Sequence, residues 1–530
     1  MSPNRMRVSL RDAVDRARDW GRLRKLLAAA LLVAVLGAGG WALWTYFGPD
    51  PSCGPGVEKR GEDEECTGVT DGSGGVSFTD ELEPVMRAIA RENERIADKE
   101  HATVAIMVPV STTDPVVKKQ IRREVQGAYL AQYRANHRSN AQSPPIRLVL
   151  ANPGHDSAHW RPVADQLVAM AHDGHNLRAV TGFDLSVRRT QDTIDYLTNE
   201  KGIPVVGGPI TADNLANTAK EPDRYRGLAR VVPTNSDQAK ALANFNKGIK
   251  ASRTLLVEDR REDDNYVQTL KQAFQEQTRN APQIPMQYES PADMNDEGRL
   301  PNDFSRMVNN ICDSDAEVIY FAGRPVHLRL FVNALGGRGC DKKTYKVVTG
   351  SGASTLATDS ELNWDALAPK GGITVEYASV AHPDAWSDKR APDTGGSREA
   401  VEELEDLART VETDGSAGPV GPVELDDSRT ISAYDSAWTA ITAIRNQTGQ
   451  KTPMPSTDDV RRAWLNLRGS QKVVGASGWI CLDNAGNPYN KAVAVVHLNP
   501  SGPKIDFVGL AWPENKPPDE HCTAPNKPGE

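Results

Sequence analysis

Short apolar segments of strand length alternate with amphipathic stretches of helix length along the first half of the chain. Four such segments come first: TVAIMVPV at 103–110, IRLVLAN at 146–152, RAVTG at 178–182 and IPVVGG at 203–208. Three stretches of helical periodicity lie between or after them, at 115–137, 159–172 and 186–200. This βαβα order predicts a parallel sheet with helices on both faces.

The same alternation starts again after residue 235. Strand-like runs lie at 254–260, 317–323 and 345–352, with helix-like stretches at 265–278 and 325–335. Two successive doubly wound units predict two lobes with a cleft between them. Later the order is less regular: an acidic, Gly-rich insertion is expected at 387–427, an amphipathic helix at 432–445, and antiparallel strands in the last 60 residues.

The N-terminal region predicts a membrane anchor. Residues 26–47 carry no charge and would be roughly 33 Å long as a helix, enough to cross a bilayer. Residues 1–25 hold eight Arg or Lys against three Asp, and aromatic residues follow the apolar run, as expected for a span with a cytoplasmic N-terminus. The alternative is a cleaved secretory signal, since 26–36 has the length of a signal core and small residues follow at 38–40.

The cysteines agree with export to an oxidising compartment. All six lie beyond the apolar run, and no CxxC pair exists that would indicate a zinc ribbon or a thioredoxin motif. Six cysteines allow fifteen pairings. We expect nearest neighbours to pair: Cys53 with Cys66, Cys312 with Cys340, and Cys481 with Cys522.

The charge distribution excludes one class of partner. The formal net charge is -9, and because the first 25 residues are basic, the remainder is more acidic still. An acidic exterior argues against nucleic acid as a partner. With 25% charged and 38% apolar residues, the exported part is typical of a soluble globular protein with room for two cores.

Seven segments, in this order, resemble a known family: TVAIMVPVS, TGFDLS to GIPVVGGPITADNL, RVVPTNSDQAKALANF, LLVEDRREDDNYVQTL, FAG to FVNALGGRG, ISAYDSAWTAITAI and GASGWICLDNAGN. They are similar to type I periplasmic solute-binding proteins of the leucine/isoleucine/valine-binding branch. The resemblance implies an α/β, two-lobed Venus flytrap, each lobe with a doubly wound parallel sheet, here preceded by one transmembrane helix. It also implies three crossings between lobes and a ligand at the hinge side of the cleft.

These inferences together give the expected domain organisation. In chain order we expect a cytoplasmic basic tail (1–25), a transmembrane helix (26–47), a juxtamembrane linker and helix (48–100), lobe 1 (101–235), lobe 2 (236–380), lobe 1 again (381–468, with the insertion), and lobe 2 with the tail (469–530).

The resemblance also implies ligand-binding residues. It places Ser186 at the family's carboxylate-binding serine, Thr211 at its threonine beside the Gly207-Gly208 backbone, and Tyr266 at its closing tyrosine. Helix capping alone is the alternative for Ser186 and Thr211. The loop at 349–352 lacks the acidic residue that would bind an α-ammonium group, and Arg324 replaces an aromatic residue. An amino acid is therefore disfavoured as ligand, and Arg324 suggests an anionic group.

Other motifs support neither a metal site nor catalysis. His155 and His159 lack the Glu of an HExxH motif, GSGAST at 350–355 lacks a full nucleotide-binding pattern, and GxSxG is absent from the sequence. We therefore expect no cofactor, no metal and no enzymatic activity. The expected function is that of a membrane-anchored extracytoplasmic solute-binding protein that clasps a small polar or anionic ligand for ABC-type uptake with a permease. The alternative is the ligand-sensing ectodomain of a signalling complex.

Overall fold

The computed structural model describes most of the chain beyond residue 51. The described ranges are 52–138, 142–218, 220–293, 296–413, 419–502 and 504–524, with six helical residues further upstream: Leu26, Leu27, Ala30, Leu31, Val33 and Ala34. Residues 1–52 and 53–530 form two units, and each is described by itself. The expected basic tail and most of the expected span at 26–47 lie outside the described residues. Within the described ranges, no helix has the length and apolar character needed to cross a membrane.

An eight-stranded mixed sheet forms the centre of lobe 1, in the order β1-β2-β3-β5-β4-β6-β7-β8. β4 to β8 are parallel, whereas β3 runs antiparallel to both β2 and β5. The strands are β1 (Ser52–Gly54), β2 (Val57–Arg60), β3 (Glu65–Thr70), β4 (Ala102–Met107), β5 (Ile146–Asn152), β6 (Leu177–Gly182), β7 (Val205–Gly207) and β8 (Leu228–Arg230). The prediction of a purely parallel sheet is therefore wrong at this edge.

The first three strands occupy a segment that we expected to be a linker. Residues 52–70 join the lobe 1 sheet through the backbone hydrogen bonds between β3 and β5. Only Val57 and Val69 bury apolar side chains there, at 1% and 8% exposure. Two apolar residues are too few to show a period of two in the sequence. Backbone pairing and the Cys53–Cys66 bridge hold this segment instead.

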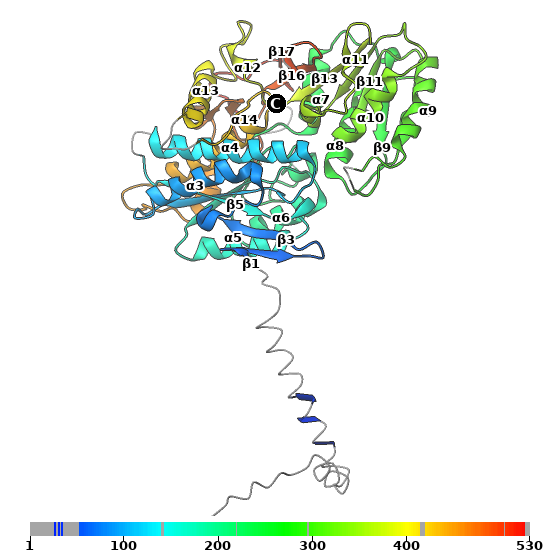
Figure 1. Cartoon of the computed structure of the whole chain (residues 1–530). Helices are drawn as coiled ribbons and strands as arrows, with labels where there is room; N and C mark the ends of the chain where they lie inside the picture. Colours follow the sequence, from blue (N-terminus) through cyan, green and yellow to red (C-terminus); the bar gives the residue numbers. More distant parts are fainter. Residues whose placement is uncertain are drawn as a thin grey trace, which may run out of the picture. The chain divides into compact units, whose positions relative to one another are not determined.

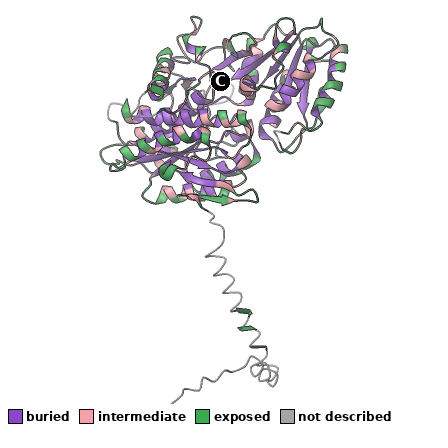
Figure 2. Ribbon diagram, in the orientation of Figure 1, coloured by how far each residue is buried: buried purple, intermediate pink, exposed green. Residues whose placement is uncertain are grey.

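Helices cover both faces of the lobe 1 sheet. One face packs against α3 (Glu83–Arg95), α4 (Pro115–His137), α13 (Arg398–Thr413), α14 (Arg429–Asn446) and α15 (Thr457–Ala463), and the other against α5 (Trp160–His172) and α6 (Arg188–Asp195). Figure 1 shows α13 and α14, which come late in the chain, lying against α4. In Figure 2 the central strands are buried between these layers, whereas the edge strands are partly exposed.

The expected irregular insertion at 387–427 contains α13, a regular amphipathic helix. Its buried residues recur at helical spacing: Val401, Leu404, Leu407, Ala408 and Val411. The acidic residues between them cover the solvent side and obscure this period in the sequence. The insertion was therefore only partly irregular.

Lobe 2 is built on a seven-stranded mixed sheet in the order β10-β9-β11-β12-β13-β16-β17. β9 to β13 are parallel, and β16 and β17 are antiparallel to their neighbours. The strands are β9 (Thr254–Asp259), β10 (Met286–Tyr288), β11 (Val318–Ala322), β12 (Tyr345–Thr349), β13 (Ile373–Ser379), β16 (Val493–Leu498) and β17 (Ile505–Ala511). The main helices are α7 (Asn235–Phe245), α8 (Asn265–Gln277), α9 (Leu300–Asp313) and α10 (Pro325–Gly336), with the short α11 (Trp364–Leu367) and the 3-10 turn η7 (Ser351–Thr358).

The chain crosses between the lobes four times, once more than the resemblance implies. It leaves lobe 1 before α7, returns after β13, leaves again at β16 and returns after β17. The hairpin β14 (Val473–Gly475) and β15 (Gly478–Ile480) packs in the core of lobe 1, although it lies in the segment assigned to lobe 2. Trp512, after β17, brings the C-terminal tail back to the core of lobe 1. The short helix α12 (Asp384–Ser387) packs in this core too.

The three nearest-neighbour disulfides are confirmed. Cys53 pairs with Cys66, Cys312 with Cys340, and Cys481 with Cys522. The first fastens the edge of the lobe 1 sheet and the second joins α9 to the loop before β12. The third fixes the C-terminal tail beside β15, so both ends of the β16–β17 hairpin return to lobe 1.

Candidate functional site

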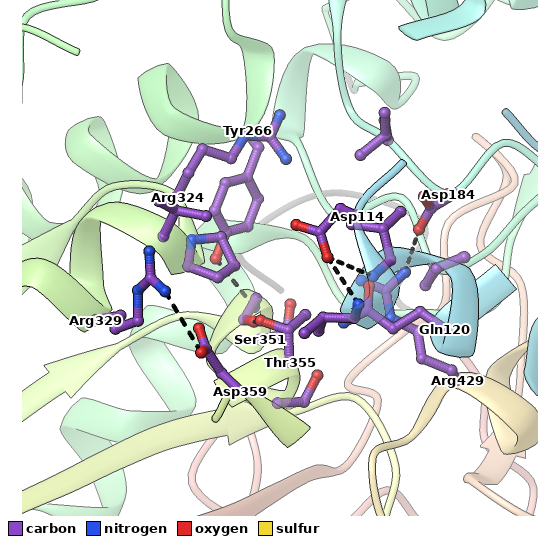
Figure 3. A pocket seen from close by; sticks show the side chains of 18 of the residues that line it. Asp114, Gln120, Asp184, Tyr266, Arg324, Arg329, Ser351, Thr355, Asp359 and Arg429 are labelled. Carbon is purple, nitrogen blue, oxygen red and sulfur yellow. Dashed lines mark hydrogen bonds and ion pairs between the residues drawn. The ribbon is translucent and has the colours of Figure 1, made fainter. Parts of the chain in front are cut away.

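A cavity of about 390 Å³ lies between the two lobes. Lobe 1 contributes the start of α4, the loops after β6 and β7, and the start of α14; lobe 2 contributes the starts of α8 and α10 together with η7 and the residues after it (Figure 3). Most of these segments follow the carboxyl ends of parallel strands, which is where open α/β sheets bind ligands. The volume of the cavity is at the small end of the range for ligand pockets.

Ser186 and Thr211 both line this cavity. Ser186 is buried in the loop after β6, and its hydroxyl oxygen accepts hydrogen bonds from the backbone N–H groups of Thr211 at 3.2 Å and Ala212 at 3.4 Å. It therefore has a capping role, yet its own proton remains available as a donor. The Thr211 hydroxyl makes no hydrogen bond with any described residue, although Thr211 is only 2% exposed. The role expected for these two residues in ligand binding stays a prediction.

Gly207 and Gly208 do not line the cavity. A Cβ atom on Gly208 would lie 2.5 Å from the hydroxyl oxygen of Ser436 and 2.8 Å from a methyl group of Val231. A Cβ on Gly207 would lie 2.7 Å from Ile210. The structure thus gives both glycines a packing role, in which they let the end of β7 approach its neighbours closely. Pro209 lines the cavity beside Thr211 instead.

Tyr266, at the start of α8, joins the two lobes. Its backbone N–H donates to the backbone oxygen of Ser186 at 3.0 Å, and its hydroxyl accepts from the backbone N–H of Gly352 at 3.1 Å. Asn265 adds a second contact between the lobes, because its side-chain amide donates to Gln191 at 3.0 Å. These hydrogen bonds show that the two lobes are in direct contact beside the cavity.

Arg324 lines the cavity but is already ion-paired. Its guanidinium donates two hydrogen bonds to Asp264, at 2.7 and 2.8 Å, and a longer one to the backbone oxygen of Ser186 at 3.4 Å. Burial lowers the pKa of Arg324, but the Asp264 carboxylate outweighs burial and the net shift is upward. An anionic ligand would therefore have to compete with Asp264. Asp264 lies 60 positions from Arg324 in the sequence, so this partner was not evident there.

Two further arginines in the lining were not identified from the sequence. Arg429, at the start of α14, donates to Glu124 at 2.7 Å and also pairs with Asp184. Arg329, on α10, lies 3.5 Å from Asp359 and also pairs with two acidic residues, Glu297 and Glu361. Their partners come from distant segments, so no local sequence signal marks these arginines.

The ionisable groups around Arg429 are strongly perturbed. Burial, and next the neighbouring Asp184 charge, raise the pKa of Glu124 well above its usual value. Burial lowers the pKa of Arg429, but Asp184 and Glu124 outweigh burial and raise it overall. Glu124, Asp184 and Arg429 form one buried charge network that connects α4, the loop after β6 and α14. Asp184 and Arg429 also line the cavity.

Asp114 and Gln120 complete the lobe 1 side. Asp114 caps α4, and one of its oxygens accepts from the backbone N–H groups of Val116 at 2.7 Å and Val117 at 3.2 Å. Gln120 is only 4% exposed, and its side-chain amide makes no hydrogen bond with a described residue. An Asp-Pro pair before a helical stretch is a recognisable N-cap signal, so Asp114 could have been found from the sequence.

Comparisons with known proteins identify the fold. No family model matches the sequence, and no curated protein matches it. The structure is similar to a leucine-binding protein from Thermotoga maritima, with 17% identity, 78% of this chain and 100% of that chain covered, and a TM-score of 0.55. A branched-chain amino acid transporter substrate-binding protein from Streptococcus pneumoniae, in complex with isoleucine, gives 15% identity, 77% and 99% coverage and a TM-score of 0.55.

A third similar structure has a different kind of ligand. It is the solute-binding protein of an ABC transporter from R. palustris in complex with 4-hydroxybenzoate, at 12% identity, 78% and 96% coverage and a TM-score of 0.53. At such low sequence identities, the structural similarities establish the fold alone. The chain has the two-lobed α/β fold of type I periplasmic binding proteins, as the sequence resemblance implied.

Proposed function

We propose that the protein is an extracytoplasmic solute-binding protein that holds a small polar ligand between its two lobes for ABC-type uptake. The observation that carries the proposal is the cavity enclosed by strand-end loops of both lobes, beside which Tyr266 bonds directly to Ser186. The similar structures, which are substrate-binding proteins, support the same role. A ligand that contacts both lobes stabilises the closed form by its additional contacts there.

Thr211 offers a clean test of the cavity. Replacing it by valine removes a hydroxyl that makes no hydrogen bond with a described residue, so protein stability should change little. Ligand affinity should fall about 5- to 150-fold, the equivalent of roughly 1 to 3 kcal/mol for a lost hydrogen bond. Ser186→Ala should weaken binding similarly and also destabilise the fold by about 1 kcal/mol, because the hydroxyl caps two backbone amides.

The measurement is a thermal-shift screen of small metabolites on the full chain, followed by calorimetry with each metabolite that binds. Ser305→Ala, on the exposed surface of α9, is the control and should bind like the parent. Tyr266→Ala keeps the backbone bond to Ser186 but removes the side chain that lines the cavity from lobe 2, so it should weaken affinity while the lobe 1 contacts remain. Equal affinity in all these variants would place the binding site elsewhere.

We also propose that residues 26–47 stay in the mature protein as a single membrane anchor with a cytoplasmic N-terminus. The uncharged run and the basic residues before it support this. Intact mass measurement of the protein from membrane fractions is expected to give the full chain. A mature N-terminus near Trp41 or Cys53 would instead indicate a cleaved leader.

A further inference from the structure

We propose that the ligand of the cleft is a small organic cation, and that its positive group lies between Asp114 of lobe 1 and Asp359 of lobe 2. The inference rests on the proposed function of the cleft. Both carboxylates line the same cavity, and Figure 3 shows them on different segments, Asp114 at the start of α4 and Asp359 directly after η7.

Asp114 faces the cavity without a positive partner. One of its oxygens accepts two backbone N–H groups, while the other makes no hydrogen bond or ion pair with the described residues. Asp114 therefore presents a carboxylate oxygen with unused acceptor capacity.

Asp359 lies in a local excess of negative charge. It shares Arg329 with two other carboxylates, those of Glu297 and Glu361, so three acids face one guanidinium. Burial raises the pKa of Asp359, Arg329 opposes this, and the Asp114 charge raises it further. The two aspartate carboxylates therefore repel each other across the cleft, and this repulsion opposes closure of the lobes. A cation between them would reverse that repulsion, and would do so most strongly when the lobes are closed.

The arginines leave no equivalent site for an anion. Each guanidinium that lines the cavity is ion-paired: Arg324 to Asp264, Arg329 to three acids, and Arg429 to Glu124 and Asp184. A ligand carboxylate or phosphate that bound a guanidinium would have to displace one of these partners. This disfavours anions that depend on an arginine, whereas Ser186 and Thr211 remain as uncharged donors in the lining.

Gln120 provides an independent indication that a ligand completes this site. Its side chain is more than nine-tenths buried, lines the same cavity and has no hydrogen-bonding partner among the described residues. Buried amides without a partner are rare in folded proteins. The buried amide nitrogen of Gln120 is the atom without a partner and offers a donor to a ligand oxygen; after a flip of the amide, its oxygen would face an ammonium N–H instead.

A metal ion does not fit this arrangement. Throughout the ranges that the structure describes, no group of three or more His, Cys, Asp or Glu side chains is placed to hold a metal. Two carboxylates on opposite lobes and a neutral amide suit a primary or quaternary ammonium group. Neighbouring hydroxyls of Ser186 and Thr211 would suit a hydroxyl group on the same molecule.

Calorimetry on the full chain at low ionic strength and pH 7.5 tests this inference. The probes are three cations (ethanolamine, choline and putrescine), the zwitterion L-isoleucine and the anion 4-hydroxybenzoate. We expect at least one cation to bind. Asp114→Asn and Asp359→Asn should each weaken its binding at least tenfold, and added salt should weaken it in the parent. Asn at position 114 keeps a capping oxygen, so this variant should fold normally.

Asp173→Asn is the matched control, because Asp173 also accepts a backbone N–H but is exposed outside the cleft. Cation binding that both cleft variants leave unchanged would overturn the inference. So would binding of L-isoleucine or 4-hydroxybenzoate, diminished by Thr211→Val, without binding of any cation; the proposed function would then still hold. If no member of the wider metabolite screen binds either, both proposals fail together.

Discussion

Replacement of Arg429 by methionine is expected to lower the free energy of unfolding by about 3 to 5 kcal/mol, the usual cost of leaving buried carboxylates without their positive partner. Arg429 is the only cation that contacts Glu124 and Asp184 among the described residues, and both carboxylates are almost completely buried. Urea denaturation of the full chain, followed by circular dichroism, measures the change.

Arg409 provides the matched control for Arg429. Its side chain is 65% exposed, and its ion pairs to Glu405 and Asp406 are long, at 3.9 and 3.8 Å. Arg409→Met should therefore change stability little, since exposed pairs contribute little. If Arg429→Met changed the free energy of unfolding as little as Arg409→Met, the ion pairs of Arg429 with Glu124 and Asp184 would contribute little to stability.

A second large effect is expected at Lys491, a lysine buried in lobe 1. Its ammonium group donates three hydrogen bonds, to the backbone oxygens of Ser477 and Gly478 and to the Ser477 hydroxyl, at 2.9 to 3.0 Å. Its charge also acts on the buried Asp435 of α14. Lys491→Met should cost about 3 to 5 kcal/mol of stability, because it removes the positive charge beside the buried Asp435 carboxylate and the ammonium donor of two backbone carbonyls.

Two measurements separate the charge of Lys491 from its packing. Burial lowers the pKa of Lys491 to about 8 against a usual value of 10.5, with Asp435 opposing the shift. Between these values the unfolded chain binds more protons, so the parent should gain stability as pH rises from 8 towards 10.5, relative to Lys491→Met. Lys247→Met, at an exposed lysine, should be neutral. A pH-independent difference would assign the effect to packing alone.

The regular parts of the fold follow from local sequence patterns. Parallel strands buried on both faces give continuous apolar runs, so the segments that became β4, β5 and β9 were recognisable directly. The strands β1 to β3 were not, because two valines, a disulfide and backbone pairing with β5 hold them. The antiparallel edges likewise depend on pairing between distant segments, which periodicity does not encode.

The candidate site was predictable in position and not in chemistry. Ser186, Thr211, Tyr266 and Arg324 all line the cavity, because loops that follow parallel strands meet at one edge of each sheet. The neutralisation of Arg324 by Asp264 depends on a contact between residues 60 positions apart, and that of Arg429 by Glu124 on one across 305 positions. Charge balance in a cleft is set by such tertiary pairs, so the expected preference for an anion could not be checked from sequence alone.

The Cys481–Cys522 bridge affects the thermodynamics of closure. The β16–β17 hairpin belongs to lobe 2, yet both of its ends are fastened to lobe 1 by this bridge and by the packing of Trp512. Because four connecting segments cross between the lobes and the bridge fixes the last of them to lobe 1, we expect the open form to have a restricted range of motion. Little configurational entropy then remains to be lost when the lobes meet. Under reducing conditions the open form regains that freedom, and the same ligand contacts hold the closed form less firmly.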